Sequence, residues 1–370
     1  MHLEELKLAN FKNYTTGEFQ FSPDVNCLTG NNGSGKTNIL DAIYYLCFCK
    51  SHFSSIDKNN IRHGEHYFSI KGRFVEDSQD DEIYCAVQEG RKKVFKRNDK
   101  AYDRLLEHIG RYPAVMITPN DVELIREGSA ERRKFIDGII AQYDKDYLIH
   151  LTDYKKVLLQ RNNLLKHFKM ENRFDPLMVE VLDQKMIALG EKIHQSRSAF
   201  IDKFQPLFQS YYEQICGHSE EVGLEYKSQL NSDVAYSEQL QKNLQADRYT
   251  QRTAVGIHKD DLIFTIHEHA LKITGSQGQQ KSFLIALKLA QFQFIKEATN
   301  KTPILLLDDV FDKIDDRRVG FLMELVSKQA FGQIFITDTH QGRVTALFDA
   351  VNIKVHEYQI TDGESEKLQV

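Results

Sequence analysis

The sequence predicts an α/β protein, in which a mixed sheet is flanked by helices and a helical lobe is inserted. Two short apolar runs, Val25–Thr29 and Ile304–Leu307, have the continuity of parallel strands that are covered on both faces. Between these runs, from about residue 129, apolar residues recur every three or four positions, which is typical of amphipathic helices. The pattern returns to that of an α/β sheet after about residue 250.

Length and composition limit the classes of protein to which this fold can belong. The chain has 370 residues, enough for two or three domain-sized units, and a formal net charge of −5. A basic surface for nucleic acid would therefore have to be local. The five cysteines form no C-x-x-C pair, which disfavours a zinc site or a disulfide framework. Without a secretory signal or a run of roughly 18–20 apolar residues, the chain is expected to be cytoplasmic and without a membrane anchor.

The changes of pattern divide the chain into three expected regions. Residues 1–128 are expected to form the first part of the sheet-containing lobe, mainly strands with one strong helix. Residues 129–250 are expected to form the helical lobe. Their two apolar stripes, at 136–165 and 182–204, are separated by a polar break and predict an antiparallel helical hairpin.

Residues 251–370 are expected to complete the sheet-containing lobe. Residues 333–337 are predicted to form a strand beside Ile304–Leu307, and residues 317–328 a helix that connects the two strands. Such a β-α-β connection is right-handed in nearly all proteins.

The glycine-rich turn after the first apolar run carries the most specific chemical motif. It fits G-x-x-x-x-G-K-[ST] at every fixed position with Gly30, Asn31, Asn32, Gly33, Ser34, Gly35, Lys36 and Thr37. The backbone N–H groups of such a loop surround phosphate oxygens at the start of a helix. Lys36 would reach the β- and γ-phosphates, and Thr37 would place its hydroxyl on Mg²⁺. The strand before the turn and the helical pattern after it predict a P-loop site for ATP and Mg²⁺.

The second half of a P-loop site is an acid at the end of a buried strand. Asp308 and Asp309 follow the apolar run Ile304–Leu307. Asp308 is predicted to hold the metal, and Asp309 to orient and deprotonate the water that attacks the γ-phosphate.

A third motif lies between these two in the chain. Residues 274–281 read TGSQGQQK and precede a helical run. Ser276 and Gly278 could contribute to an anion-binding helix start, although Ser276 would serve equally well as an ordinary N-cap. The order of phosphate loop, Ser-x-Gly-Gln turn and acidic strand resembles that of ABC ATPases. In that family the serine and glycine contact the γ-phosphate bound to a partner subunit.

Within this class the chain resembles the RecF family. The resemblance spans residue 3 to about 340 and rests on residues 6–14 (LKLANFKNY), 118–128 (TPNDVELIREG) with Arg132 and Arg133, 256–262 (GIHKDDL) and 275–281. It implies an ABC-type head with two lobes and slow, DNA-stimulated ATP hydrolysis. It further implies an ATP-dependent homodimer that binds gapped, single-stranded and double-stranded DNA. RecR and RecO are the implied partners, with which the protein would place RecA on gapped DNA.

Several positions depart from the family pattern. Residues 311–315 read FDKID, so only Asp315 clearly holds the dimer-facing position, and Lys259 and Lys281 stand where arginine is common. Asp309 replaces the glutamate that is usual in transporter ATPases. Asp338 stands at the switch-histidine position of those transporters, and His340, two residues later, receives no catalytic assignment. On resemblance alone, residues 11–14 are candidates for contacting adenine.

Other functions would use the same nucleotide motifs. The ATPase subunit of a membrane ABC transporter would need a membrane partner and normally has a shorter helical lobe. An SMC-like chromosome-structuring ATPase would carry a much longer coiled coil. A small-molecule P-loop kinase is disfavoured because it needs no Ser-x-Gly-Gln turn.

Two basic groups in the sequence could contact DNA. The candidates are Lys92, Lys93, Lys96 and Arg97 in a basic strand-like segment, which could equally be a sheet edge protected by lysine. Arg132, Arg133 and Lys134 form a second basic group, for which a solvated first turn of a helix is the alternative.

Overall fold

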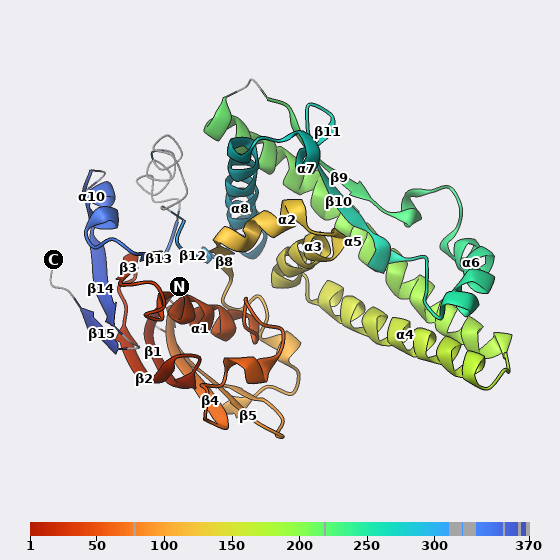
Figure 1. Cartoon of the computed structure of the whole chain (residues 1–370), viewed down its shortest axis with the longest axis horizontal. Coiled ribbons are helices and arrows are strands. Elements are labelled where there is room, and N and C mark those ends of the chain that lie inside the picture. Colours follow the sequence, from red (N-terminus) through yellow and green to blue (C-terminus); the bar gives the residue numbers. More distant parts are fainter. Residues whose placement is uncertain are drawn as a thin grey trace. The chain divides into compact units, whose positions relative to one another are not determined.

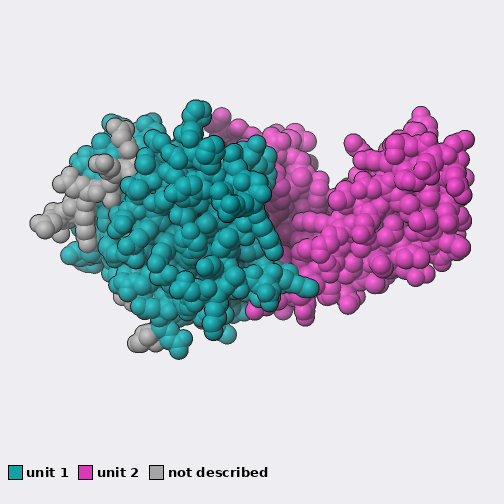
Figure 2. Space-filling view, turned by 90° about the horizontal axis from the view of Figure 1, so that it is seen from below, with its two compact units in different colours: residues 1–121, 281–370 teal, residues 122–280 magenta. Residues whose placement is uncertain are grey.

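The computed structural model describes residues 1–76, 79–217, 220–310, 320, 331–350, 352–361 and 364–367. These residues form two compact units, coloured separately in Figure 2: unit 1 is Met1–Asp121 with Lys281–Val370, and unit 2 is Val122–Gln280. The units thus divide at different positions from the boundaries expected at residues 128 and 250. The helix expected at 317–328 and the residue Asp315 lie outside the described residues.

Residues 251–280 belong to unit 2, rather than to the sheet-containing lobe, because of strand pairing. The strand β10 (Asp261–Ile266) pairs with β9 (Val222–Lys227) and with β11 (His269–Ala270) in a three-stranded antiparallel sheet. These backbone hydrogen bonds join residues 261–270 to the end of the helical region, a connection that the local sequence pattern does not reveal.

The first sheet of unit 1 is antiparallel and has six strands in the order β2-β1-β4-β5-β6-β7. Its strands are β1 (His2–Phe11), β2 (Tyr14–Gln20), β4 (Tyr67–Glu76), β5 (Gln79–Gln88), β6 (Val94–Arg97) and β7 (Lys100–Ala101).

The second sheet of unit 1 also has six strands, in the order β15-β14-β3-β13-β12-β8. Its strands are β3 (Val25–Thr29), β8 (Ala114–Ile117), β12 (Ile304–Leu307), β13 (Ile334–Asp338), β14 (Val355–Thr361) and β15 (Glu364–Lys367). All neighbours are parallel except β14 and β15. The mixed sheet and both buried apolar strands are confirmed, as is the strand predicted beside Ile304–Leu307.

Helix α1 (Lys36–Phe48) packs between the two sheets, against β1, β4 and β5 of the first and β8 and β13 of the second. Ile39, Ile43 and Leu46 recur at helical spacing and are fully buried. The other helices assigned wholly or mainly to unit 1 are α8 (Gln277–Thr299), which begins in unit 2, α10 (Arg343–Asp349), and the short 3₁₀ turns η1 (Asp57–Asn60), η2 (Leu105–Glu107) and η3 (Pro119–Val122).

Unit 2 is built around two long helices, α4 (Lys145–Met170) and α5 (Pro176–Cys216), which run antiparallel and pack along each other (Figure 1). Each begins at an aspartate that caps it: Asp144 accepts from the Tyr147 N–H, and Asp175 from the Leu177 N–H. The cap at Asp144 divides the first apolar stripe into two helices.

The remaining helices are α2 (Glu123–Arg126), α3 (Ser129–Tyr143), α6 (Tyr236–Thr250), α7 (Leu271–Thr274), η4 (Gln229–Asn231) and η5 (Ile257–Lys259). Of the helices that the structure describes, none has the length and apolar character needed to cross a bilayer.

Arg197, on α5, lies at the centre of a buried polar network in unit 2. It is 1% exposed, and its guanidinium donates to Asp137 on α3, to the Ile257 carbonyl and to Asp260. Asp260 also accepts from the Tyr226 hydroxyl on β9. The network therefore joins α3, α5 and β9 to residues 256–262, the segment that resembles a RecF motif.

His258 in the same segment is held in a defined tautomer. Its Nε2 lies 3.0 Å from the Thr253 carbonyl oxygen, which can only accept, so Nε2 carries the hydrogen. Nδ1 is then an acceptor and receives the Tyr154 hydroxyl at 2.9 Å. Burial lowers the pKa of His258 to about 4. Both hydrogen bonds are those of a neutral imidazole.

The protein should therefore lose stability as the pH falls, because the unfolded chain takes up a proton at His258 that the folded protein does not. The folded pKa is about 4 and the ordinary value is 6.5, so the stabilising effect is complete above pH 6.5 and decreases as the pH falls toward 4. Within that window the loss should be about 1.4 kcal/mol for each pH unit. Denaturant unfolding of wild type and His258→Gln at several pH values measures it. We expect a flatter acid limb for the variant, and equal slopes for the two proteins would contradict the assignment.

Candidate nucleotide-binding site

The site is located by three parallel strands that end at the same edge of the second sheet. The strand β13 lies between β3 and β12, and its register pairs Asp338 with Thr29 and Ile336 with Leu307. The phosphate loop follows β3, and the acid pair follows β12. Because the carboxyl ends of parallel strands meet at one edge, segments far apart in the sequence become neighbours.

All three glycines of the phosphate loop have a positive φ, and two of them also lack space for a side chain. Gly30 has φ +148°, and a Cβ there would lie 2.3 Å from the Ile360 carbonyl oxygen. Gly35 has φ +113°, and a Cβ there would lie 2.6 Å from the Asn13 amide nitrogen. Glycine is therefore required at both positions by the backbone and by the space available. Asn31, Asn32 and Gly33 between them are exposed.

Lys36 folds back over this loop. Its ammonium donates to the carbonyl oxygens of Gly30 at 2.7 Å and Asn31 at 2.9 Å, and the residue is 5% exposed. An ammonium group has three hydrogens, so one remains beyond these two bonds. Lys36 thus fixes the loop and can still donate to a phosphate oxygen.

Thr37 and Asp308 meet directly. The Thr37 hydroxyl donates to Asp308 Oδ1 at 2.7 Å, although the two residues are 271 positions apart. The Thr337 hydroxyl on β13 donates to the same oxygen at 3.0 Å. Burial raises the pKa of Asp308, which the bonds from Thr37 and Thr337 partly offset.

Asp309 follows in a left-handed backbone conformation, with φ +46°. Its N–H donates to the Thr337 hydroxyl oxygen at 2.8 Å, and the residue is half-buried. This turn sends the chain away from β12 directly after Asp308. The side chains of the two acids lie close together, since the Thr337 hydroxyl oxygen is 3.0 Å from Asp308 Oδ1 and 3.5 Å from Asp309 Oδ1.

Several observations fit a triphosphate with Mg²⁺. Magnesium prefers oxygen ligands and keeps several of its waters, so one hydroxyl and one carboxylate are an adequate protein contribution. Thr37 and Asp308 supply that pair. The Ser34 hydroxyl in the loop is buried and has no hydrogen-bond partner among the described residues. The described residues contain no group of three His, Cys, Asp or Glu side chains that would hold a different metal.

Asn13 and Tyr14 support the phosphate loop, and the rings of Phe11 and Tyr14 offer no surface to adenine. Phe11 and Tyr14 are fully buried in the core. The Tyr14 hydroxyl donates to the Gly35 carbonyl at 3.2 Å, and the Asn13 amide donates to the Ser34 carbonyl at 3.1 Å. Neither aromatic ring has an exposed face on which a base could stack, so these two residues are not adenine contacts.

Ser276 and Gly278 lie in unit 2, at the start of α8. Ser276 is the N-cap: its hydroxyl oxygen accepts from the Gln279 N–H at 3.2 Å, while the Gln279 side chain accepts from the Ser276 N–H at 2.8 Å. This reciprocal pair is a capping box. Ser276 is exposed, and its hydroxyl hydrogen is not used in the capping bond.

His340 does not take the place of a switch histidine. Its backbone N–H donates to Asp338 at 2.7 Å, and its side chain is 69% exposed. Asp338 is buried and pairs with Arg343 at 2.8 Å. Asp338 therefore closes the turn between β13 and α10, and its carboxylate is occupied by structural contacts.

The basic segment at residues 91–100 divides into structural and exposed cations. Lys93 points inward and pairs with Asp57 at 2.8 Å, while Arg97 pairs with Asp81 at 2.8 Å. Lys92 is exposed, and Lys96 lies on the face of β6 opposite the buried Phe95. Neither lysine has an ion-pair partner among the described residues, so Lys92 and Lys96 remain the DNA candidates of this segment.

The second basic group, Arg132, Arg133 and Lys134, makes hydrogen bonds and ion pairs within unit 2. Arg132 binds both carboxylate oxygens of Asp261, at 2.7 and 3.0 Å, and Arg133 donates to the Asp260 carbonyl. Lys134 pairs with Glu131 on the same helix. These contacts favour a structural role for the first turn of α3.

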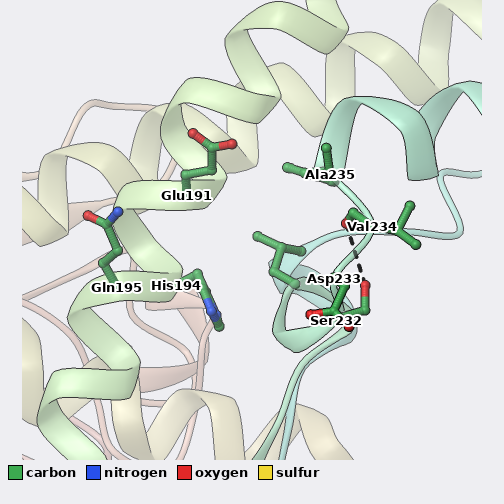
Figure 3. Close-up of a pocket in the computed structure, with 9 residues that line it drawn as sticks. Glu191, His194, Gln195, Ser232, Asp233, Val234 and Ala235 are labelled. Carbon is green, nitrogen blue, oxygen red and sulfur yellow. Dashed lines mark hydrogen bonds between the residues drawn. The ribbon is translucent and has the colours of Figure 1, made fainter.

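A pocket of about 250 Å³ in unit 2 is separate from these residues (Figure 3). Glu191, His194 and Gln195 border it from α5, and residues 232–235 border it from the loop before α6. No residue of the phosphate loop, the acid pair or the Ser-x-Gly-Gln turn lines it. The pocket therefore coincides with none of the three predicted nucleotide motifs.

Comparison with known proteins agrees with these motifs. The profile of the RecF/RecN/SMC N terminal domain matches residues 2–362. A protein of Flavobacterium johnsoniae, DNA replication and repair protein RecF, is 46% identical over 348 residues, which are 94% of this chain and 96% of the relative. A protein of the same name from Parabacteroides distasonis is 45% identical over 369 residues, with 100% of both chains covered.

Solved structures show the same relationship. The recombination mediator protein RecF with ATP, of the RecFOR pathway, has a TM-score of 0.90 and 28% identity, covering 100% of this chain and 98% of its own. An Smc head domain from Pyrococcus furiosus has a TM-score of 0.57 and 19% identity over 100% of this chain and 96% of its own. At that identity, only the ABC-type head fold is shared.

Replacing Lys36 should remove most of the affinity for ATP. Lys36→Ala deletes the cation that would meet the phosphates and also frees the Gly30 and Asn31 carbonyls that it holds. We expect the affinity to fall by at least about tenfold, the effect of losing one charge-assisted bond of roughly 1.5–3 kcal/mol. Titration calorimetry with a slowly hydrolysed ATP analogue measures it. Lys7→Ala, on the surface of β1, is the matched control, and equal affinities for both variants would remove Lys36 from the site.

Proposed function

Because the chain belongs to the RecF family of DNA replication and repair proteins, we propose that it is an ATP-dependent DNA-binding protein of recombinational and gap repair. The observation that supports this most directly is the contact between Thr37 and Asp308, beside a loop that only glycine can form. The membership disfavours a transporter subunit, and the long arm of an SMC protein is not needed to explain unit 2.

ATP is the proposed nucleotide, and Mg²⁺ its companion. The phosphate loop and Lys36 would receive the β- and γ-phosphates, and Thr37 and Asp308 would hold the metal. Mg²⁺ supplies charge neutralisation at the phosphates. The resemblance to a RecF structure with ATP along the whole chain supports this choice.

Asp309 is the proposed base for slow hydrolysis. It would orient a water molecule and accept its proton as the water oxygen bonds to the γ-phosphorus. The bond from that phosphorus to the β–γ bridging oxygen breaks, which releases ADP and phosphate. An aspartate reaches less far than the glutamate usual in transporter ATPases. This shorter reach is the proposed reason for slow turnover.

A second copy of the chain is proposed to complete the site. The loop residues Asn31, Asn32 and Gly33 are exposed, and so is Ser276 at the start of α8. The Ser276 hydroxyl accepts within its capping box and keeps its hydrogen for a phosphate oxygen. In the proposed homodimer, Ser276 and Gly278 of each copy contact the γ-phosphate in the other, so that ATP binding closes the dimer and hydrolysis opens it.

A bulky cation at Ser276 should prevent dimerisation while ATP still binds. Ser276→Arg places a long side chain where a γ-phosphate would have to approach the helix start. We expect light scattering to show an ATP- and Mg²⁺-dependent dimer for wild type and a monomer for the variant. Calorimetry should give ATP affinities within about threefold of each other, a difference below 1 kcal/mol. Ser232→Arg, another exposed serine of unit 2, should dimerise normally; a dimer of Ser276→Arg would contradict the shared site.

DNA, RecR and RecO are the proposed macromolecular partners, and RecA loading on gapped DNA is the proposed outcome. For DNA, the structure narrows the candidates in the basic segment to Lys92 and Lys96, since Lys93 and Arg97 have partners within unit 1. Contacts of this kind are to phosphate and are independent of base sequence.

Removing Lys92 and Lys96 together should weaken DNA binding and make it less sensitive to salt. Each lost phosphate contact should reduce the slope of log K against log salt by about one. Fluorescence anisotropy with gapped duplex at several salt concentrations compares Lys92→Ala/Lys96→Ala with Lys7→Ala/Lys71→Ala, whose lysines pair with Glu18 and Glu82. If both double variants keep the wild-type slope, this segment does not bind DNA.

A further inference from the structure

Thr337 occupies a central position in the site, although no motif includes it. It lies near the end of β13, between the strand that leads to the phosphate loop and the strand that leads to the acid pair. The residue is 1% exposed. Its neighbours in β13, Ile334, Phe335 and Ile336, are apolar, so its hydroxyl is a polar group at the end of a buried apolar strand.

Both hydrogen-bonding functions of this hydroxyl are used by the two acids. The oxygen accepts from the Asp309 backbone N–H at 2.8 Å. The single hydroxyl hydrogen points to Asp308 Oδ1 at 3.0 Å, whereas Asp309 Oδ1 lies further away, at 3.5 Å. One side chain therefore links the carboxylate of the first acid to the backbone of the second.

The hydrogen bond from the Asp309 N–H to Thr337 is important because Asp309 has an unusual backbone conformation. A left-handed conformation at φ +46° is sparsely populated by aspartate and persists where the surroundings fix it. The bond from its N–H to Thr337 is a contact of this kind. Rotation of that peptide would swing the Asp309 side chain away from its place after β12.

We propose that Thr337 is a positioning residue for ATP hydrolysis, whose hydroxyl fixes Asp309 relative to Asp308. This inference rests on the proposed function, in which Asp309 directs the attacking water. Thr337 itself touches no phosphate in this scheme. It affects the hydrolytic step through the second acid, whereas Lys36 and the loop glycines determine nucleotide affinity.

The test separates turnover from affinity in variants of one residue. Thr337→Val keeps the branched shape and removes the hydroxyl, and Thr337→Ser keeps the hydroxyl and removes a methyl group. Single-turnover hydrolysis at saturating ATP and Mg²⁺ gives the rate, and calorimetry with a slowly hydrolysed analogue gives the affinity. A displacement of a catalytic group by about 1 Å can cost roughly a hundredfold in rate. We therefore expect Thr337→Val to be roughly tenfold to a hundredfold slower, with ATP affinity changed less than about threefold.

Thr337→Ser should recover most of the rate, because the hydroxyl alone makes both bonds. Thr345→Val is the matched control: the Thr345 hydroxyl also donates to a buried carboxylate, that of Glu357 at 2.9 Å, but lies outside the site. It should leave the rate unchanged. Equal rates for wild type and Thr337→Val, or equal losses of rate and affinity in Thr337→Val, would overturn the inference.

Asp309→Asn, measured in parallel, distinguishes this inference from the function on which it rests. If Asp309→Asn hydrolyses ATP at the wild-type rate, the role proposed for Asp309 is wrong, and that of Thr337 falls with it. If Asp309→Asn is inactive while Thr337→Val is fully active, only the role of Thr337 is wrong. Should Thr337→Val not fold, Thr337→Ala removes the same hydroxyl with less bulk. Failure of both to fold would mean that the hydroxyl serves the fold rather than hydrolysis.

Discussion

The parallel pairing of β3, β13 and β12 is the constraint on which the rest of the site depends. It brings the segments after residues 29, 307 and 338 to one edge of a sheet. The contact between Thr37 and Asp308 follows from this register. Thr37 lies after β3 and Asp308 after β12; the two residues are 271 positions apart in the chain, but only β13 lies between the two strands in the sheet. A slip by one residue would turn the side chains of a strand to the opposite face and separate the two halves of the site.

Among the described residues, threonine hydroxyls and the backbone position the acids at this edge. Asp308 receives two threonine hydroxyls, and Asp309 is anchored through its peptide N–H. Burial raises the pKa of Asp308, since charge is unfavourable there, and the neighbouring carboxylate of Asp309 adds to the increase. Neutral donors orient the carboxylate without cancelling its charge, whereas an ion pair would occupy it, as Arg343 occupies Asp338. In the proposed site Asp308 would therefore be the acid that holds the metal, whereas the carboxylate of Asp338 is already engaged by Arg343.

Much of this arrangement follows from local sequence, and the remainder depends on partners that are distant along the chain. Continuous apolar runs identify β3 and β12, and fixed spacing identifies the phosphate loop, because both signals are local. Arg161 and Arg197 were missed. Both occupy positions in apolar helical stripes, a detectable signal, but the acids that neutralise them lie 22 to 86 positions away in the chain. These acids are Asp183 and Asp247 for Arg161, and Asp137 and Asp260 for Arg197. For the same reason, sequence alone did not separate Lys93 and Arg97, which pair with Asp57 and Asp81, from the other candidates for DNA contact.

The RecF-like segment at residues 256–262 shows how a distinctive motif can serve the internal structure of its unit. Its acids bind Arg132 and Arg197, and its histidine binds Tyr154. Buried ion pairs add little net stability compared with apolar packing, but an unpaired member is strongly unfavourable. Such a network therefore favours one arrangement of α3, α4, α5 and β9 over alternatives in which a charge loses its partner. Ser276, the N-cap of α8, follows this segment closely in the chain. The network that the motif maintains therefore also supports the Ser-x-Gly-Gln turn.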